Sequence, residues 1–422
     1  MTITRLDVAA ASAHTLANVR ALGDEQVPLA RALGRVLARD VVSPVSLPPW
    51  DNASMDGYAV RAEDVRGASA SNPARLLVVS TIAAGTRADR SLAAGEAMRI
   101  MTGAPVPEGA DTVIRVEDTD AGTASVTISD DRDLTRNIRL RGEDVTADHR
   151  VIERGVQLSA AHVGVLSSVG CASPWVHRVP RVAILATGDE IVPVEEFDRV
   201  RTGDRIVSSN SYSLAAAVQA AGGEPVPLGI APDDPERLAD CLRGAEGCDL
   251  VLTSGGVSVG DFDFTRAVVT QLGGTLSMWR VKMRPGAPLG FGSLFGVPWL
   301  GLPGNPVSAL VTFELFGRPL VRALSGNARP HRRPVSVVVG EPIVLGAPLV
   351  HFLRVVLDDE IASALPVARL TGAQSSGMLT SMSAAHALLI VPPELQEVQA
   401  GTVLRAIPLD GDLGGSSQFP AQ

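Results

Sequence analysis

The chain has 422 residues, which is too many for one ordinary core and predicts roughly two to four domains. Its formal net charge of −9 argues against a general nucleic-acid binder and against a protein that binds anionic membranes. Anionic substrates would therefore be bound by local cations, metal ions or backbone amides. Of the 37 basic residues one is a lysine, Lys282, so an arginine at an expected lysine position reflects composition.

The sequence predicts a cytoplasmic protein. It holds three cysteines, an odd count whose spacing fits neither a disulfide framework nor a zinc ribbon: Cys171, Cys241 and Cys248. We expect them to be reduced and buried. The N-terminus does not resemble a secretory signal. The longest uncharged stretch, 286–313, contains six glycines and three prolines before residue 305, which a membrane-spanning helix would not tolerate.

The first half of the chain predicts a β-rich unit between helices. Apolar residues at helical spacing predict a helix over 27–42, the second of two helices before residue 45. Short alternating stretches broken by glycines and charged turns, such as 74–85 and 124–131, follow over about 51–144. Helical spacing returns at 157–169, which indicates that the β-rich unit is an insertion.

Strands then alternate with helices, a pattern typical of a parallel α/β sheet with helices on both faces. The expected strands are 182–188, 224–230, 249–256, 275–284 and the start of 299–316. The expected helices are 209–223, 234–247, 263–274 and the end of 299–316. The loops that follow the strands should meet at one edge, where ligand sites of α/β proteins occur.

The C-terminal part predicts another β-rich unit, with strands in 335–344, 351–357, 386–393 and 402–409. The division we expect is a helical linker (1–47 and 146–178), an inserted β-rich domain (48–145), an α/β domain (179–328) and a C-terminal β domain (329–409). The Gly/Ser-rich tail, 410–422, is expected to be disordered.

The segment TSGGVSVGDFDF (253–264) is the most informative motif. Gly255 and Gly256 permit close backbone approach to a ligand, and their amides, with those of the next two residues, Val257 and Ser258, can form a nest for an anion. Asp261 and Asp263 would place carboxylates beside that anion, where Mg²⁺ could bridge them. The structural alternative is a glycine turn followed by an aspartate helix cap.

Two more strand ends carry polar motifs. In LPGNPVSALVTF, Gly304 opens a turn, Asn305 is a plausible helix N-cap and Pro306 occupies the first helical position, where an anion can bind. A well-capped structural helix explains this segment equally. In VAILATGDE, Asp189 and Glu190 follow a strand and could bind metal or orient water, or simply form a solvated turn.

Arg280, Lys282 and Arg284 are spaced by two, so on a strand their side chains share one face while Val281 and Met283 point to the core. Three like charges on one face favour a nearby anionic ligand. The alternative is an edge strand that uses basic residues to prevent aggregation.

Seven motifs in order resemble one family: DNASMDGYA, TGAPVPEGAD, NIRLRGEDV, ATGDE, TSGGVSVGDFD, RPGAP and GLPGNPVSA. Together they are similar to the molybdopterin molybdenumtransferases of the MoeA type, which include the E domain of gephyrin, from the first helices to about Leu409. The resemblance implies a homodimer of elongated four-part subunits, with a C-terminal β-barrel-like domain and the site at a cleft between subunits. It also implies insertion of molybdenum from molybdate into adenylylated molybdopterin, release of AMP, and Mg²⁺ as helper ion.

The resemblance assigns roles to individual positions. The family's functional acids and threonine fall on Asp56, Thr102, Asp144, Glu190, Asp233 and Asp263, and the expected metal ligands are Asp189, Glu190, Asp261 and Asp263. The expected substrate and anion contacts are Gly255, Gly256, Ser258, Arg280, Lys282, Arg284, Pro303, Gly304, Asn305, Pro306, Ser308, Arg354 and Ser376. Family members carry lysines at positions 280 and 284, and a third lysine where this chain has Ala287.

Two other functions fit parts of the sequence. A molybdopterin adenylyltransferase would share the α/β domain and would consume ATP, but the units before residue 175 and after residue 329 are typical of the inserting enzyme. A non-catalytic cofactor-binding or scaffold paralogue is the third interpretation, and the intact set of acids argues against it. Transient contact with the adenylylating protein is a further expectation.

Overall fold

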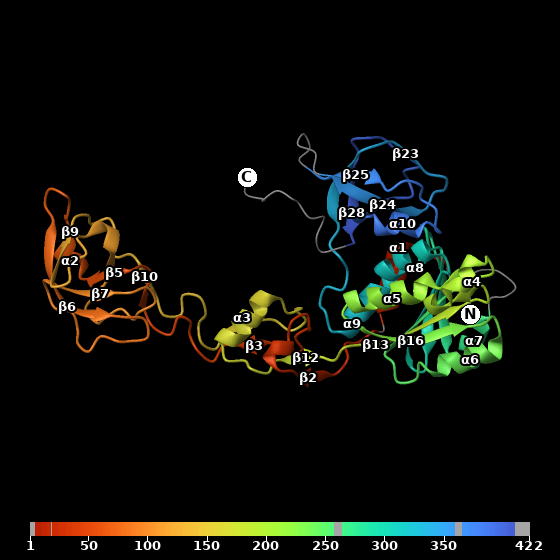
Figure 1. Cartoon of the computed structure of the whole chain (residues 1–422), viewed down its shortest axis with the longest axis horizontal. Coiled ribbons are helices and arrows are strands. Elements are labelled where there is room, and N and C mark those ends of the chain that lie inside the picture. The colour runs from red at the N-terminus through yellow and green to blue at the C-terminus, as the bar shows by residue number, and fades with distance from the viewer. Residues whose placement is uncertain (1–4, 18, 257–263, 359–364, 410–422) are drawn as a thin grey trace. The chain divides into compact units, whose positions relative to one another are not determined.

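The structure is a computed structural model that describes residues 5–17, 19–256, 264–358 and 365–409. The chain forms two compact units (Figure 1). Unit 1 comprises Met1–Arg39, Arg154–Ala160 and Ser173–Gln422, and unit 2 comprises Asp40–Glu153 and Ala161–Ala172.

Unit 1 is built on a seven-stranded sheet. In spatial order its strands are β1 (Arg5–Leu6), β18 (Thr275–Val281), β20 (Pro288–Leu294), β21 (Val297–Leu302), β17 (Leu250–Ser254), β13 (Arg181–Thr187) and β16 (Glu224–Ala231). β21, β17, β13 and β16 are parallel, as the alternation of strands and helices predicts. β20 was not predicted; it runs antiparallel to both its neighbours, so the sheet is mixed.

Helices cover both faces of this sheet (Figure 1). One face packs on α1 (Val8–Leu16), α5 (Ser209–Ala220), α8 (Pro306–Thr312) and α9 (Arg318–Leu324), and the other on α6 (Pro235–Arg243) and α7 (Thr265–Gln271). Within β13, Val182 and Ile184 join the first core while Ala183 and Leu185 join the second. This alternation explains why a strand buried on both sides has a continuous apolar sequence.

A second sheet of unit 1 closes into a five-stranded barrel. Its strands are β24 (Val350–Asp358), β25 (Val367–Leu370), β22 (Val335–Val339), β28 (Val403–Pro408) and β26 (Ala387–Val391), and β26 pairs back to β24. The sixth strand, β19 (Met283–Arg284), pairs in parallel with the start of β24, which ties the barrel to the segment that follows β18. The antiparallel pair of β23 (Ile343–Val344) and β27 (Glu397–Val398), and helix α10 (Leu379–Ser383), complete this part.

The helix predicted over 27–42 is wrong. The segment holds a short 3-10 turn, η1 (Leu29–Arg31), β-bridges at Val36 and Leu37, and β3 (Val41–Val42). Pro28 sets the start of η1, and Gly34 has a φ of +77°, a left-handed conformation that interrupts a helix. Backbone groups of 34–38 bond to 156–158 and 175–177 instead, including β12 (Trp175–His177), which pairs with β2 (Asp24–Gln26). Tertiary pairing thus overrides helical periodicity here.

Unit 2 contains a five-stranded sheet: β8 (Thr112–Arg115), β5 (Gly57–Val60), β7 (Glu96–Ile100), β6 (Ala74–Ile82) and β9 (Ser125–Ile128). Unit 2 also contains two separate antiparallel ribbons, β4 (Asn52–Ala53) with β10 (Ile138–Arg139) and β3 with β11 (Arg150–Ile152), and the short helices α2 (Ala62–Val65) and η2 (Val116–Asp118). Helix α3 (Ala160–Ser168) follows, as predicted. The strands predicted over 74–85 and 124–131 are confirmed by β6 and β9.

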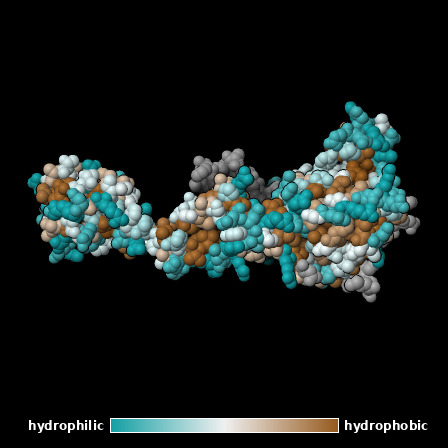
Figure 2. Space-filling view, turned by 90° about the horizontal axis from the view of Figure 1, so that it is seen from below, coloured by the Kyte–Doolittle hydropathy of each residue, from teal (hydrophilic) through white to brown (hydrophobic). Residues whose placement is uncertain are grey.

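The surface agrees with the composition, but the expectation that all three cysteines are buried holds for one of them. On the face seen in Figure 2, hydrophobic residues form separate patches among hydrophilic ones. No helix of the described part has the length and apolar content needed to cross a membrane. Cys248 is buried, and burial raises its pKa, whereas Cys171 and Cys241 are half-buried.

Candidate functional site

A cavity of about 690 Å³ lies where β13, β17 and β21 end, the edge at which the sequence predicts a ligand site. We call it the glycine-turn cavity. Of the predicted site residues it brings together Glu190, Asp233, Gly255, Gly256, Pro303, Gly304, Asn305 and Pro306. Ser258, Asp261 and Asp263 lie outside the described residues.

Gly255 and Gly256 have φ angles of +97° and +63°, a region that favours glycine. A Cβ atom on Gly255 would lie 2.7 Å from the carbonyl oxygen of Thr187, and one on Gly256 would collide with the hydroxyl of Thr265. The Gly255 N–H donates to the Leu302 carbonyl at 3.1 Å, so this amide is used within the fold. The turn is therefore held tightly against its neighbours.

Buried polar atoms without partners gather at this edge of the sheet. Eight such side-chain atoms occur in the described part of the chain, and four belong to the ends of β13 and β17 and the starts of α5 and α7: Thr187 Oγ1, Asn210 Oδ1, Thr253 Oγ1 and Thr265 Oγ1. Native proteins leave few buried polar atoms unsatisfied, so a concentration of them calls for an explanation. A polar ligand or bound water at the site supplies one.

Two carboxylates, Glu190 and Asp233, line the cavity, and a third, Asp189, lies beside them. Asp189 and Glu190 follow β13, and Asp233 follows β16; the Asp233 N–H donates to Asp189 Oδ1 at 3.2 Å. Burial raises the pKa of Asp233, and repulsion from Asp189 and Glu190 raises it further. Gly188, with a φ of +143°, makes room for Glu190, because a Cβ there would meet the Glu190 carboxylate.

These acids suit a hard cation without forming a closed metal site. In the described part of the chain no three or more His, Cys, Asp or Glu side chains converge on one point. Carboxylate oxygens are nonetheless the donors that Mg²⁺ prefers, usually one or two from the protein with the rest from water and substrate phosphate. Asp189 and Glu190 fit that demand, and a cation there would relieve the repulsion that raises the pKa of Asp233.

A second cavity, of about 860 Å³, lies between the Arg284–Pro288 turn, the start of α8 and strand β24 of the barrel. We call it the barrel cavity; it shares Pro288 and Asn305 with the first. Its lining includes five predicted residues: Arg284, Asn305, Ser308, Arg354 and Ser376. Ser308 is 4% exposed, so it forms part of the cavity wall and presents little surface to a ligand.

Arg354 is completely buried, and its guanidinium serves a loop of the barrel. It donates to the carbonyl oxygens of Ala373 and Ser375 at 3.1 Å and to Ser381 Oγ at 2.9 Å. Burial lowers its pKa. The same loop reaches α8, because the Ser376 carbonyl accepts the Val307 N–H at 3.1 Å. Arg354 therefore shapes the cavity wall through the backbone of 373–376.

The first turn of α8 is satisfied largely from within the protein. Asn305 is its N-cap but its side chain makes no capping hydrogen bond, and Pro306 at the first position has no N–H. Because the Val307 N–H already bonds to the Ser376 carbonyl, this short helix has fewer free N–H groups for an anion than the sequence pattern suggests.

The predicted alternation of cations is confirmed: Val281 and Met283 are buried, Arg280 is half-buried, and Lys282 and Arg284 are exposed. The segment is not one strand, however. β18 ends at Val281 in the first sheet, where the Lys282 N–H still bonds to the Leu6 carbonyl at 2.8 Å, and β19 pairs with β24 in the other sheet. Arg284 is the one cation of the three that lines the barrel cavity.

Three predicted residues belong to unit 2. Asp56 Oδ1 accepts two hydrogen bonds from Thr102, from its N–H and its hydroxyl, each 2.7 Å long. The Asp144 N–H donates to the Leu47 carbonyl at 3.0 Å, and its side chain is exposed. The backbone N–H of Thr102, then its hydroxyl, lower the pKa of Asp56.

Asn210 was not among the predicted site residues, yet its side chain links two of the loops around the glycine-turn cavity. The SNSY motif that contains it predicts only a helix start.

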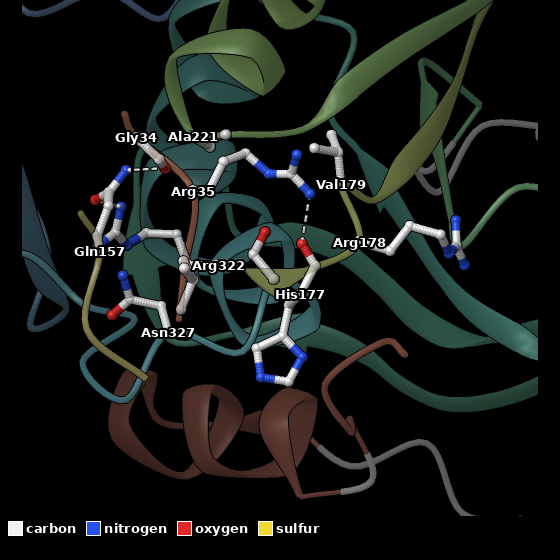
Figure 3. Close-up of a pocket in the computed structure, with 12 residues that line it drawn as sticks. Gly34, Arg35, Gln157, His177, Arg178, Val179, Ala221, Arg322 and Asn327 are labelled. Carbon is white, nitrogen blue, oxygen red and sulfur yellow. Dashed lines mark hydrogen bonds between the residues drawn. The ribbon is translucent and has the colours of Figure 1, made fainter. Parts of the chain in front are cut away.

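A third, small cavity lies elsewhere in unit 1, between Arg35, Gln157, His177 and Arg322 (Figure 3). Its volume of about 20 Å³ has room for one water, and Arg35 donates a hydrogen bond to the His177 carbonyl beside it. This cavity is therefore part of the packing between segments and is too small for a substrate.

Comparisons with known proteins cover nearly the whole chain. Family models match three segments: "MoeA N-terminal region (domain I and II)" at 6–170, "Probable molybdopterin binding domain" at 183–323 and "MoeA C-terminal region (domain IV)" at 336–409. Molybdopterin molybdenumtransferase 2 of Mycobacterium tuberculosis is 39% identical over 92% of this chain and 95% of its own length. Molybdopterin molybdenumtransferase of Nostoc is 41% identical over 72% of this chain and 70% of its own length.

Solved structures agree. The crystal structure of the molybdopterin biosynthesis moeA protein from Pyrococcus horikoshii covers 96% of this chain and 100% of its own, with a TM-score of 0.82 and 27% identity. On its motifs, its fold and these matches, the chain belongs to the molybdopterin molybdenumtransferase family of the MoeA type.

Proposed function

We propose that this protein is a molybdopterin molybdenumtransferase: it inserts molybdenum from molybdate into adenylylated molybdopterin and releases AMP. One observation carries the proposal. Two cavities of unit 1 adjoin at Pro288 and Asn305, one walled by a glycine turn and carboxylates, the other lined by Arg284 and three serines. Such a pair suits two substrates, a nucleotide-activated pterin and an oxyanion, held next to each other.

The pterin nucleotide is assigned to the glycine-turn cavity. Gly255 and Gly256 line this cavity with their backbone, and the unpartnered hydroxyls packed against the turn offer donors to a phosphate. Molybdate is assigned to the barrel cavity, where Arg284 provides a planar donor group suited to an oxyanion. The shared wall would bring the two reacting groups together.

Breaking the phosphoanhydride of the substrate needs neutralisation of developing charge, with little covalent help from the protein. A bound Mg²⁺ would supply Lewis-acid stabilisation of the phosphates. Asp189 and Glu190 would hold it, together with Asp261 and Asp263 as the motif suggests. Asp233, with its raised pKa, would keep a proton to higher pH than a free aspartate.

We further propose a cytoplasmic homodimer of four-part subunits, with the division given by the sequence. Asp56, Thr102 and Asp144 would then act in the site of the partner subunit, since the family places its site between subunits. Light scattering tests this: a mass of about 44 kDa at micromolar concentration, the 43.9 kDa of one chain, would contradict it. Transient contact with the adenylylating protein would deliver the substrate.

The deciding experiment supplies adenylylated molybdopterin and molybdate without ATP and follows AMP release and cofactor formation. We expect both to occur. Dependence on ATP with molybdopterin as substrate would favour the adenylyltransferase, and binding without turnover would favour a non-catalytic paralogue.

A further inference from the structure

Asn210 lies at the second position of α5, and its side chain is 8% exposed. Its Nδ2 atom donates to Ser254 Oγ and to the Gly304 carbonyl oxygen, both at 2.8 Å. A carbonyl oxygen can only accept, so the bond to Gly304 fixes which end of the amide is the nitrogen. Both protons of Nδ2 are therefore used, and they go to two different loops.

Ser254 extends this link. Its hydroxyl accepts from Asn210 and donates in turn to the Pro303 carbonyl at 3.3 Å. Two adjacent carbonyls of the turn after β21, those of Pro303 and Gly304, are thus bound by one linked pair of side chains. The turns are close: a Cβ on Gly304 would lie 3.6 Å from Gly255 Cα. The helix α5, the glycine turn and the Pro303–Asn305 turn are tied at one point.

The amide is kept at a cost. Asn210 Oδ1 is buried and has no hydrogen-bond partner. A buried acceptor left unpaired opposes folding, and an apolar residue would avoid that penalty but could not donate. The donors of Asn210, rather than its contribution to stability, are the reason the position suits asparagine.

We propose that Asn210 is a positioning residue for the pterin nucleotide: its amide fixes the glycine turn relative to the Pro303–Asn305 turn, and nucleotide affinity depends on that spacing. This inference rests on the proposed function, because both turns line the cavity assigned to the nucleotide. Asn210 and both turns line the glycine-turn cavity, whereas the barrel cavity is reached only by Asn305 at the end of one turn, so molybdate affinity should depend on Asn210 much less than nucleotide affinity does.

The test uses the full chain with Asn210→Asp and Asn210→Ala. Aspartate has nearly the same shape but replaces both donors with an acceptor that faces the Gly304 carbonyl. Asn327→Asp is the matched control, because the Asn327 side chain acts as an acceptor, from the Arg329 N–H at 2.9 Å, and aspartate keeps that role. Calorimetry measures affinity for AMP and for molybdate, and hydrogen exchange follows the peptides around 250–256 and 300–306.

Both Asn210 variants should weaken AMP binding by at least about tenfold, leave molybdate affinity within about twofold, and speed exchange in both turns together. The control should match the native protein. Unchanged AMP affinity in a folded Asn210 variant overturns the inference, and so does an equal loss for AMP and molybdate, which would mean general loosening. A native protein that binds no AMP contradicts the proposed function instead; the exchange data still decide whether Asn210 ties the turns.

Discussion

Thr102 directs both its N–H and its hydroxyl at one oxygen of Asp56, although 46 positions separate the two residues. Gly57 at the start of β5 pairs with Ile100 at the end of β7, and this register places the residues just beyond the two strands side by side. The two bonds lower the pKa of Asp56 and fix one carboxylate oxygen, which leaves the other for a ligand.

Thr102→Val should raise the pKa of Asp56, because it removes the hydroxyl bond and keeps the backbone bond. If Asp56 acts as a carboxylate, the acid limb of the pH–rate profile moves to higher pH, and at a fixed pH on that limb the rate falls by up to about tenfold for each pH unit that the limb moves. Thr86→Val is the control, since the Thr86 hydroxyl binds only the local Ala83 carbonyl. An unmoved acid limb in Thr102→Val would remove Asp56 from the reaction.

The lowered pKa of Asp56 also predicts how the thermal stability of the Thr102→Val variant depends on pH. The pKa of Asp56 is depressed in the folded state, so its bonds stabilise the fold above the unfolded pKa, and this contribution is lost as pH falls through the folded pKa. Thr102→Val should therefore lower Tm at neutral pH, and the difference should shrink in acid. A difference that grows below about pH 4 would contradict this assignment.

Gly255→Ala should abolish nucleotide binding, because the added Cβ would meet the Thr187 carbonyl at 2.7 Å in a backbone conformation that already disfavours alanine. Gly222→Ala separates the two effects: Gly222 has a φ of +94° and open space around a Cβ. The control should lose about 1 kcal/mol of stability from backbone strain and keep AMP affinity. Equal AMP affinity in both variants would show that the turn is not at the ligand.

Much of the fold follows from the sequence because strands such as β13 and β17 bury both faces and form short apolar runs between glycines. The helix prediction for 27–42 was wrong because the backbone partners of this segment lie more than 100 residues away, at 156–158 and 175–177. The local sequence contains no sign of these distant partners. β20 was missed for a related reason: its sequence is that of a glycine-rich loop, and its pairing with β18 and β21 alone makes it a strand.

The site shows the same division. The glycine turn, the acids and Arg284 could be predicted because their chemistry is visible in short motifs. The link from Asn210 to Gly304 joins positions 94 apart, and the role of Arg354 depends on three carbonyls of a loop about 20 residues further on. Side chains that act by holding backbone have no motif of their own, so they emerge only with the structure.

Asp233→Asn should raise Tm at neutral pH. The pKa of Asp233 is raised in the folded state, so stability falls as pH rises through the window between the unfolded and folded pKa values, and an amide escapes that loss. Asp234→Asn is the control, because Asn can still cap α6 by accepting the Arg237 N–H, as Asp234 does at 2.9 Å. If Asp233→Asn lowers Tm at about pH 7 as much as at about pH 4, the surroundings do not raise the pKa of the Asp233 carboxyl.

AMP release should stop in EDTA and return with Mg²⁺. Because a ligand that binds the folded state stabilises it, Mg²⁺ should also raise the Tm of the native protein, and Glu190→Gln should lose most of this increase. Glu236→Gln, an exposed position in the first turn of α6, serves as control. Full turnover in excess EDTA would exclude the metal, and a Glu190 variant that responds normally to Mg²⁺ would exclude Glu190 as its ligand.

Arg284 is the cation on which molybdate binding should depend most. It lies on β19 opposite His351 of β24, lines the barrel cavity and is exposed, whereas Lys282 is exposed away from the cavity. Loss of a charge-assisted bond to an oxyanion typically weakens binding by about tenfold or more, so Arg284→Ala should raise the molybdate Kd by about that factor.

Lys282→Ala removes the same charge two residues away and should leave the molybdate Kd within about twofold, and Arg280→Ala should fall between the two. Arg284→Lys should keep part of the affinity, because lysine restores the charge but not the planar pair of donors. Calorimetric titration of each variant with molybdate decides the order. Equal affinity in Arg284→Ala and Lys282→Ala would mean that the exposed cations of this segment serve solubility, as on an edge strand, and that molybdate binds elsewhere.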